Sequence, residues 1–272
     1  MLEAFVHPTA IIGDGAKIHE TAKIGPYAVI GGNVTIGAGT RVGAHAVIDG
    51  HTTIGDKCNI FPSASVGLEP QDLSYKGEAT GVIIGNRTTL REFATVHRGT
   101  GDRFTVIGDD CFFMNYSHVA HDCRMGNGVI LANGATFGGH CQVGDYVVCG
   151  GLVVFHQHVR VGRMVMISGA MGTRADMPPF ALCDGRPARV VGVNAVGMRR
   201  QKFSVPTRTA IKSAYKLIYR SGLNTANALA KIESELPDLP ELREIVEFYR
   251  SSKRGVIKGG FDDENGDEGG EG

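Results

Sequence analysis

Apolar residues in the first part of the chain recur with a period of six. The ten positions spaced by six from Ile12 to Val66 are all occupied by Ile or Val. Glycine usually follows this aliphatic residue, and a small residue usually stands four positions after it, as Gly25 and Ala28 do after Ile24. Amphipathic helices repeat every 3.6 residues and half-buried strands every two, so neither element explains the pattern.

We interpret the six-residue period as a triangular parallel β-solenoid. Each hexad would supply one short strand, with its aliphatic residue pointing inward, and one corner at which glycine tolerates the turn. Three hexads then close one coil of eighteen residues. The sequence therefore predicts a mainly β fold, a parallel β-helix.

Two interruptions of the register predict loops. The pattern resumes at Ile84 after a gap of one full coil, which leaves the irregular segment 68–81 outside it. After Val96 the next hexad begins eleven residues later instead of six, so a second loop is expected near 98–105. Loops that project from a rigid scaffold often carry binding and catalytic residues.

The last part of the chain changes character. The repeat ends near residue 193, and apolar residues such as Ile211 and Ala214 then follow a helical spacing. We predict a β-helix over residues 1–193 and a small α-helical domain over residues 194–257 that covers the open end of the solenoid. Residues 258–272 are acidic and rich in glycine, so this tail is expected to be disordered.

Composition narrows the classes of function. The 28 basic and 28 acidic residues balance, which removes a bulk electrostatic argument for binding nucleic acid. No run of about 18 apolar residues occurs and the N-terminus has no signal pattern, so neither a membrane span nor export is expected. Six cysteines without a CxxC pair favour reduced thiols in a cytoplasmic protein over disulfides or a zinc ribbon.

The segment NYSHVAHD, residues 115–122, places two histidines beside an aspartate. Because one coil has eighteen residues, Gly139 should lie one coil beyond His121, and His158 one coil beyond His140. The expected column consists of His121, Gly139, His140, Gln157 and His158.

Such a column suits acid–base chemistry. An imidazole can act as a general base when a carboxylate orients its other nitrogen, and Asp122 directly follows His121. The amide of Gly139 is placed to donate to a developing oxyanion. No Ser or Cys stands in an elbow motif, so direct attack by an acceptor is favoured over a covalent acyl-enzyme. A zinc site formed by histidines between subunits is the competing interpretation.

Eight segments between about residues 4 and 257 carry a more specific signal. They are HPTAIIGDGAKI, IGPYAVIGGNVTIG, QDLSYKGEAT, VHRGT, HVAHDCRMGN, GGLVVFHQ, DMPPFALCDGRPARVVGVN and AYKLIYRSG. Together they resemble the UDP-N-acetylglucosamine O-acyltransferases of lipid A biosynthesis. The resemblance implies a left-handed β-helix, a homotrimer, and transfer of a 3-hydroxyacyl chain from acyl carrier protein to the 3-hydroxyl of UDP-N-acetylglucosamine, without a cofactor.

The resemblance also implies roles for individual residues. His121 would be the general base, Asp122 would orient it, and the amide of Gly139 would hold the oxyanion. The residues implied to bind the substrates are Gln71 and Asp72 in the first loop, His118, His140, His156 and Gln157 in the solenoid, and Asn194 and Arg200, which would hold the nucleotide. Gly169 matches the position that limits acyl length, and no metal is implied.

Three positions depart from the family pattern. Ser74 stands where the family often has lysine, Val196 where glutamate is expected, and Gln201 where a second arginine is expected. Arg199 and Lys202 are close enough to compensate for the last change. These departures bear on the nucleotide contacts and the acceptor, so a 3-amino UDP-sugar stays open as an alternative acceptor. A trimeric zinc-dependent hydratase on the same solenoid is the less favoured alternative.

Overall fold

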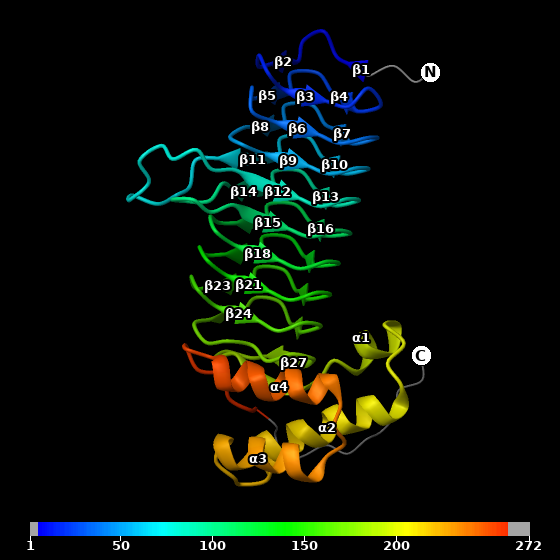
Figure 1. Ribbon diagram of the computed structural model, residues 1–272, viewed down its shortest axis with the longest axis vertical. Coiled ribbons are helices and arrows are strands. Elements are labelled where there is room, and N and C mark those ends of the chain that lie inside the picture. The colour runs from blue at the N-terminus through cyan, green and yellow to red at the C-terminus, as the bar shows by residue number, and fades with distance from the viewer. Residues whose placement is uncertain (1–4, 261–272) are drawn as a thin grey trace.

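The computed structural model describes residues 5–260, and their strands form a three-sided solenoid (Figure 1). The chain passes from a first sheet to a second and a third and then returns to the first, and strands of neighbouring coils pair in parallel. Lys23 pairs with Arg41, eighteen residues further on. The predicted parallel β-helix is confirmed.

Each sheet consists of short strands stacked along the solenoid. The first sheet holds β1 (Phe5–Val6), β4 (Lys23–Ile24), β7 (Arg41–Val42), β10 (Asn59–Ile60), β13 (Thr89–Leu90), β16 (Phe112–Phe113), β19 (Ile130–Leu131), β22 (Val148–Cys149), β25 (Met166–Ile167), β27 (Ala181–Asp184) and the antiparallel β28 (Arg189–Val193). The second holds β2 (Ile11–Ile12), β5 (Val29–Ile30), β8 (Val47–Ile48), β11 (Ser65–Leu68), β14 (Thr95–His97), β17 (His118–Val119), β20 (Thr136–Phe137), β23 (Val154–Phe155) and β26 (Gly172–Thr173). The third holds β3 (Lys17–Ile18), β6 (Thr35–Ile36), β9 (Thr53–Ile54), β12 (Val82–Ile84), β15 (Thr105–Ile107), β18 (Arg124–Met125), β21 (Gln142–Val143) and β24 (Arg160–Val161).

The core lies along the axis of the solenoid. The aliphatic residue of each hexad points inward, and Ile24 and Ile48 are completely buried. The small residue four positions later is also buried, as at Ala28. Ile12 is only partly buried because its strand lies at the open end of the second sheet, where no preceding coil covers it.

Two edges of the solenoid carry recurring polar side chains. The edge between the second and third sheets, with corner residues 120–123, 138–141 and 156–159, is here called the histidine edge. The edge between the third and first sheets is here called the Asx edge, because Asp or Asn recurs there. Its corners are residues 55–58, 85–88, 108–111, 126–129 and 144–147.

A ladder of side chains runs along the Asx edge. Backbone N–H groups donate to a carboxylate or amide oxygen of the next coil at 2.7 to 2.8 Å, and the accepting residues are Asp56, Asn86, Asp109, Asn127 and Asp145. Glycine precedes each of them. A Cβ at Gly55 would lie 2.7 Å from Asn86 Oδ1, so glycine makes room for the accepting side chain.

Both loops leave the solenoid at the histidine edge. One spans residues 69–81 between β11 and β12, and the other spans residues 98–104 between β14 and β15. Leu68 and Thr105, which the sequence places in the loops, are strand residues in the structure. The first loop projects as the cyan excursion in Figure 1.

Within the described residues, four helices follow the solenoid: α1 (Ala195–Arg200), α2 (Val205–Arg220), α3 (Thr225–Glu235) and α4 (Pro240–Ser251). They lie at the end of the solenoid (Figure 1), where α3 packs on α2 and α4. The Arg163 guanidinium of the last coils pairs with Glu244 of α4 at 2.6 Å. Ser204 and Asn224 cap the N-termini of α2 and α3. None of the helices in residues 5–260 is long and apolar enough to cross a membrane.

The chain then returns to the solenoid. Val190 donates its N–H to the carbonyl of Lys258, and Gly260 donates to the carbonyl of Val190, each at 2.9 Å. Residues 258–260 are therefore paired, although the sequence places them in a disordered tail, because β28 offers them a free edge. The remainder of that tail lies outside the described residues.

Candidate active site

His121 and Asp122 form a hydrogen-bonded pair at a corner of the histidine edge. His121 Nδ1 lies 2.7 Å from Asp122 Oδ2, and both side chains are nearly buried, with 10% and 1% of their surface exposed. A carboxylate can only accept a hydrogen bond, so the proton of this contact belongs to Nδ1. The lone pair of the imidazole therefore lies on Nε2.

Asp122 is held from three sides. Its carboxylate accepts the backbone N–H of Thr100 at 3.0 Å and the Thr100 hydroxyl at 2.8 Å, besides His121. Its own N–H donates to Thr105 Oγ1 at 2.9 Å. Burial alone would raise the pKa of Asp122, but the hydrogen bonds from His121 and Thr100 outweigh it and leave that pKa below its usual value. The group is therefore a carboxylate at neutral pH.

Gly139 packs directly on the side of the imidazole that carries Nε2. A Cβ at this position would lie 2.6 Å from both Cε1 and Nε2 of His121, so any larger residue would collide with the ring. The carbonyl of Gly139 accepts from His158, whereas its N–H has no hydrogen-bond partner among residues 5–260. A base nitrogen and an unused amide donor thus lie side by side.

His140 and His158 continue the column. Their rings stack at 4.5 Å, and His140 meets the edge of His121 at 5.1 Å. His140 Nε2 lies 3.7 Å from Asp122 Oδ2. Burial lowers the pKa of His140, with the nearby carboxylate acting in the opposite direction. His140 thus adds a polar wall beside the His121–Asp122 pair.

His118 lies on the second sheet beside this corner. Its Nδ1 contacts Thr95 Oγ1 at 2.7 Å, and its pKa is lowered by burial and by the charge of His121. His97 meets the His118 ring edge-on at 5.0 Å. Burial lowers the pKa of His97 to about 4, and its Nδ1 has no partner within residues 5–260. These two imidazoles are neutral at pH 7.

The first loop brings Asp72 toward the histidines. Its carboxylate accepts the N–H and the hydroxyl of Ser74 at 2.8 and 2.9 Å. These hydrogen bonds are the main reason that its pKa is lowered, and electrostatic interactions with His121 and His140 add to the effect. Gln71, beside it, is exposed. Ser74 thus orients a loop carboxylate that faces the histidine edge.

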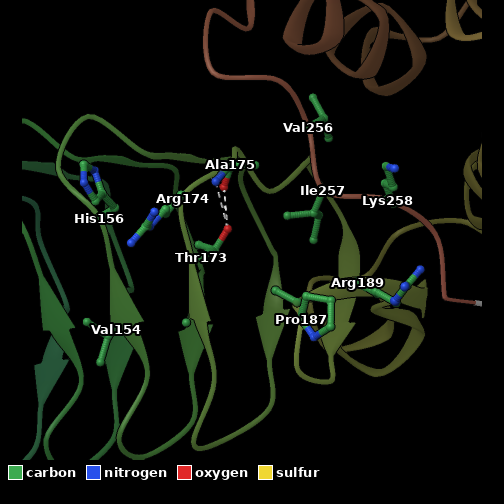
Figure 2. Close-up of a pocket in the computed structure, with 12 residues that line it drawn as sticks. Val154, His156, Thr173, Arg174, Ala175, Pro187, Arg189, Val256, Ile257 and Lys258 are labelled. Atoms are coloured by element: carbon green, nitrogen blue, oxygen red, sulfur yellow. Dashed lines mark hydrogen bonds between the residues drawn. The ribbon is translucent and has the colours of Figure 1, made fainter.

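His156 and Gln157 lie one coil further along the same edge, and both are exposed. His156 borders a hollow of about 820 Å³, which Figure 2 shows between the solenoid and the C-terminal segment. The hollow combines apolar residues with cationic ones, among them Arg174, Arg189 and Lys258. His121 does not line it. The surface beside His156 is therefore suited to an anionic group with an apolar stem.

Comparison with known proteins assigns these features to a family. The family described as Udp N-acetylglucosamine O-acyltransferase, Domain 2, matches residues 176–257, and the bacterial transferase hexapeptide repeat matches residues 15–50 and 104–139. The acyl-[acyl-carrier-protein]–UDP-N-acetylglucosamine O-acyltransferase of Thermodesulfovibrio yellowstonii is 48% identical over 93% of this chain and 99% of its own length. The chain belongs to the UDP-N-acetylglucosamine O-acyltransferase family.

Solved structures agree with this assignment along the whole fold. LpxA from Acinetobacter baumannii is 41% identical with a TM-score of 0.90, and the match covers 93% of this chain and all of that one. The UDP-N-acetylglucosamine acyltransferase from Campylobacter jejuni is 39% identical with a TM-score of 0.88, covering 93% of this chain and 99% of that one. The resemblance found in the sequence motifs is confirmed.

Three predicted site residues of this acyltransferase lie away from the histidine edge. Asn194 caps α1 by accepting from Gly197 N–H at 2.8 Å, and its amide donates to the carbonyl of Met164 at 2.8 Å near the Asx edge. Arg200 is exposed at the end of the same helix. Gly169 lies on the third edge, between β25 and β26. The single chain does not bring these residues to His121.

His121, Asp122 and His140 also lie close enough together for a metal site, with one potential ligand atom of each within 4.8 Å of the others. Zinc sites with protein ligands of this kind need three or four free donor atoms. Here both oxygens of Asp122 already accept hydrogen bonds, and His121 Nδ1 is one of the donors. The donor set fits an oriented base better than a metal.

Sequence reasoning missed His97, Thr95, Thr100 and Thr105. Thr95 and His97 lie in β14, and Thr105 is the first residue of β15. Thr100 lies in the loop between these strands, where the register is broken. The VHRGT segment signals this loop within the acyltransferase family, but the hexad pattern says nothing about which loop residue faces Asp122.

Proposed function

We propose that this protein transfers a 3-hydroxyacyl chain from acyl carrier protein to the 3-hydroxyl of UDP-N-acetylglucosamine, the first step of lipid A biosynthesis. The relative from Thermodesulfovibrio yellowstonii carries the name of this activity. The observation that supports it most directly is the contact of His121 with Asp122 on one side and Gly139 on the other.

The reaction proceeds by direct attack on the thioester. His121 Nε2 removes the proton from the sugar 3-hydroxyl while the oxygen forms a bond to the thioester carbon. The carbonyl oxygen becomes an oxyanion and accepts a hydrogen bond from the N–H of Gly139. When the intermediate collapses, the carbon–sulfur bond breaks and the proton on His121 passes to the leaving sulfur. The products are the ester and the free thiol of the carrier.

Asp122 contributes by fixing the imidazole rather than by moving a proton. Its hydrogen bond to Nδ1 keeps the lone pair on Nε2 and stabilises the imidazolium that forms during attack. Because its lowered pKa keeps it ionised, this support persists throughout the working range of pH. Asp122 is a positioning residue for the base.

The remaining residues hold the substrates. His118, His140 and Asp72 surround the corner and supply donors and acceptors for sugar hydroxyls, with Gln71 beside them. His156 and Gln157 lie further along the edge, where the cationic hollow suits a phosphate-bearing group. In this proposal, the acceptor sugar binds near His121, and the charged groups of the substrates bind closer to the helices.

The complete site requires a homotrimer in this proposal. Asn194, Arg200 and Gly169 do not reach the histidine edge of their own chain, so they would serve the site of the partner subunit. There Arg200 would pair with the nucleotide diphosphate, and Gly169, which has no side chain, would leave room for a longer acyl chain. The six buried, unpaired cysteines fit a reducing cytoplasm.

Product analysis tests the proposal. The protein is incubated with carriers bearing 3-hydroxyacyl chains of several lengths and with either UDP-N-acetylglucosamine or its 3-amino analogue, and the products are identified by mass spectrometry. We expect an O-acylated UDP-sugar. Preferred acylation of the 3-amino sugar would favour the alternative acceptor, and absence of acyl transfer to both sugars would contradict the proposal.

The zinc-dependent hydratase is a second candidate because His121, Asp122 and His140 cluster. Metal analysis of the purified trimer, together with an assay of carbon dioxide hydration, separates the two. Stoichiometric zinc with hydration activity would replace the acyltransferase proposal. Acyl transfer that persists after treatment with a chelator would exclude the hydratase.

A further inference from the structure

The loop of residues 98–104 reaches back over the corner that carries the catalytic pair. It leaves β14 and returns in β15, both one coil before Asp122. Thr100 in this loop donates two hydrogen bonds to Asp122, from its N–H to Oδ1 at 3.0 Å and from its hydroxyl to Oδ2 at 2.8 Å. A single loop residue therefore engages both oxygens of the carboxylate.

The return of the loop holds the backbone of the same residue. Thr105, the first residue of β15, accepts the N–H of Asp122 at 2.9 Å. Asp122 has a φ of 61°, in the left-handed region that is unfavourable for a residue with a side chain. The two threonines at either side of the loop thus fix both the backbone and the carboxylate of Asp122.

Close approach of the loop depends on Gly99. A Cβ on Gly99 would lie 3.0 Å from Asp122 Oδ1 and would collide with the carbonyl of Arg103. Only glycine allows the loop to fold tightly enough for the next residue, Thr100, to reach the carboxylate. The loop of residues 98–104, which breaks the register, therefore holds Asp122 at this corner.

The carboxylate has two histidines within reach. Asp122 Oδ2 lies 2.7 Å from His121 Nδ1 and 3.7 Å from His140 Nε2. With a side chain that is only 1% exposed, it cannot turn to water, so rotation would carry it toward one ring or the other. The orientation of the carboxylate therefore decides which imidazole it pairs with.

We propose that Thr100 is a positioning residue, which holds the Asp122 carboxylate on His121 Nδ1 and away from His140 Nε2. The inference rests on the proposed function, in which His121 is the base. It extends that function by giving the loop of residues 98–104 a role in catalysis. Gly101, Asp102 and Arg103 are exposed, so an event at this surface that lifts the loop would also release Asp122.

Two substitutions distinguish the effect of the Thr100 hydroxyl from the effect of the size of its side chain. Thr100→Val keeps the size and the backbone donor but removes the hydroxyl, and we expect kcat to fall about tenfold with KM nearly unchanged, because a charge-assisted hydrogen bond is lost. Thr100→Ser restores the hydroxyl and should recover most of kcat. Thr53→Val, on an exposed strand position of the third sheet, serves as the matched control and should leave both parameters unchanged.

The thermal midpoint of each variant is measured alongside the kinetics. An unchanged kcat in Thr100→Val, or an equal loss in Thr100→Val and Thr100→Ser, would overturn the inference. A Thr100→Val variant that loses only thermal stability and keeps its kcat would also overturn it. A failure of the proposed function is distinguishable, because the unsubstituted protein would then transfer no acyl chain. A failure of the assignment of His121 as the base would instead leave acyl transfer intact in His121→Asn.

Discussion

The histidine edge and the Asx edge share one backbone but use their polar residues differently. Corner residues on both edges have φ near 60°, 61° at His140 and 57° at Tyr146. On the Asx edge, Asp and Asn side chains accept backbone N–H groups of the neighbouring coil. On the histidine edge, the imidazoles contact one another and Asp122, and the N–H of Gly139 lacks a partner among the described residues.

This difference shows how a repeat acquires a site. Polar side chains that accept backbone N–H groups of the neighbouring coil stabilise the coil. Polar side chains that contact other side chains keep a lone pair or a donor available, as His121 Nε2 does. The role of a corner residue therefore depends on its partners more than on its type.

Among substitutions that leave His121 itself in place, the largest effect is expected for Asp122→Asn on the histidine edge. The amide offers an N–H to Nδ1 as well as a carbonyl, so the variant no longer fixes the lone pair on Nε2. We expect kcat to fall on the order of a hundredfold to a thousandfold, within the range of general-base catalysis. Steady-state kinetics checks this, and a variant with more than a third of the original kcat would break the comparison.

A pair of glycine substitutions contrasts the two edges directly. Gly139→Ala places a Cβ 2.6 Å from His121 Nε2, and Gly55→Ala places one 2.7 Å from Asn86 Oδ1. The first should displace the base and lower kcat on the order of a hundredfold. The second should keep kcat and lower the free energy of unfolding by about 1–3 kcal/mol. If both variants lost activity equally, the edges would not differ as described.

Acid should affect the two regions at different pH. The folded-state pKa of His97 is about 4, below its ordinary value of 6.5, so the unfolded chain binds the extra proton. Stability conferred by the buried neutral ring is present above pH 6.5 and is lost as the pH falls toward 4, by about 2 kcal/mol at pH 5. Asp109 on the Asx edge has a lowered pKa, so its contribution is lost only below pH 3.8.

Denaturant unfolding between pH 3 and 7 measures these two steps. His97→Asn should remove the step between pH 6.5 and 4 and keep the step at lower pH. A His97→Asn variant whose free energy of unfolding has the same pH dependence as the original protein would show that protonation of His97 does not destabilise the fold.

The smallest effect is expected for Asn86→Ala on the Asx edge. This substitution removes the acceptor for the N–H of Asp56, which lies at the surface and can turn to water. The free energy of unfolding should fall by about 1 kcal/mol, and kcat should not change. Unfolding curves and kinetics on the same preparation check both parts. A drop in kcat would show that the Asx edge contributes to activity and would contradict its purely structural role.

The sequence predicts the solenoid well because its period is a physical requirement of the coil. Ile24, Ile48 and the other register positions are inward-facing, and the same arithmetic places Gly139 beside His121. Both loops are found where the register breaks. Local spacing suffices for these features because each coil contacts only its neighbours.

Other features depend on contacts that spacing does not encode. Thr100 reaches Asp122 only through the folded path of the loop, and His97 is buried where its ring packs edge-on against His118. Asn194 matches a nucleotide-binding position by resemblance, yet within one chain its side chain caps a helix. In the proposed homotrimer, Asn194 would serve the site of a neighbouring subunit.

The most direct test of the account is the turnover of His121→Asn. Transfer from a 3-hydroxyacyl carrier protein to UDP-N-acetylglucosamine is followed by mass spectrometry, with the thermal midpoint of the same preparation as the control for folding. The account predicts that kcat falls on the order of a thousandfold while the midpoint stays unchanged. Turnover within a few-fold of the original protein would contradict it.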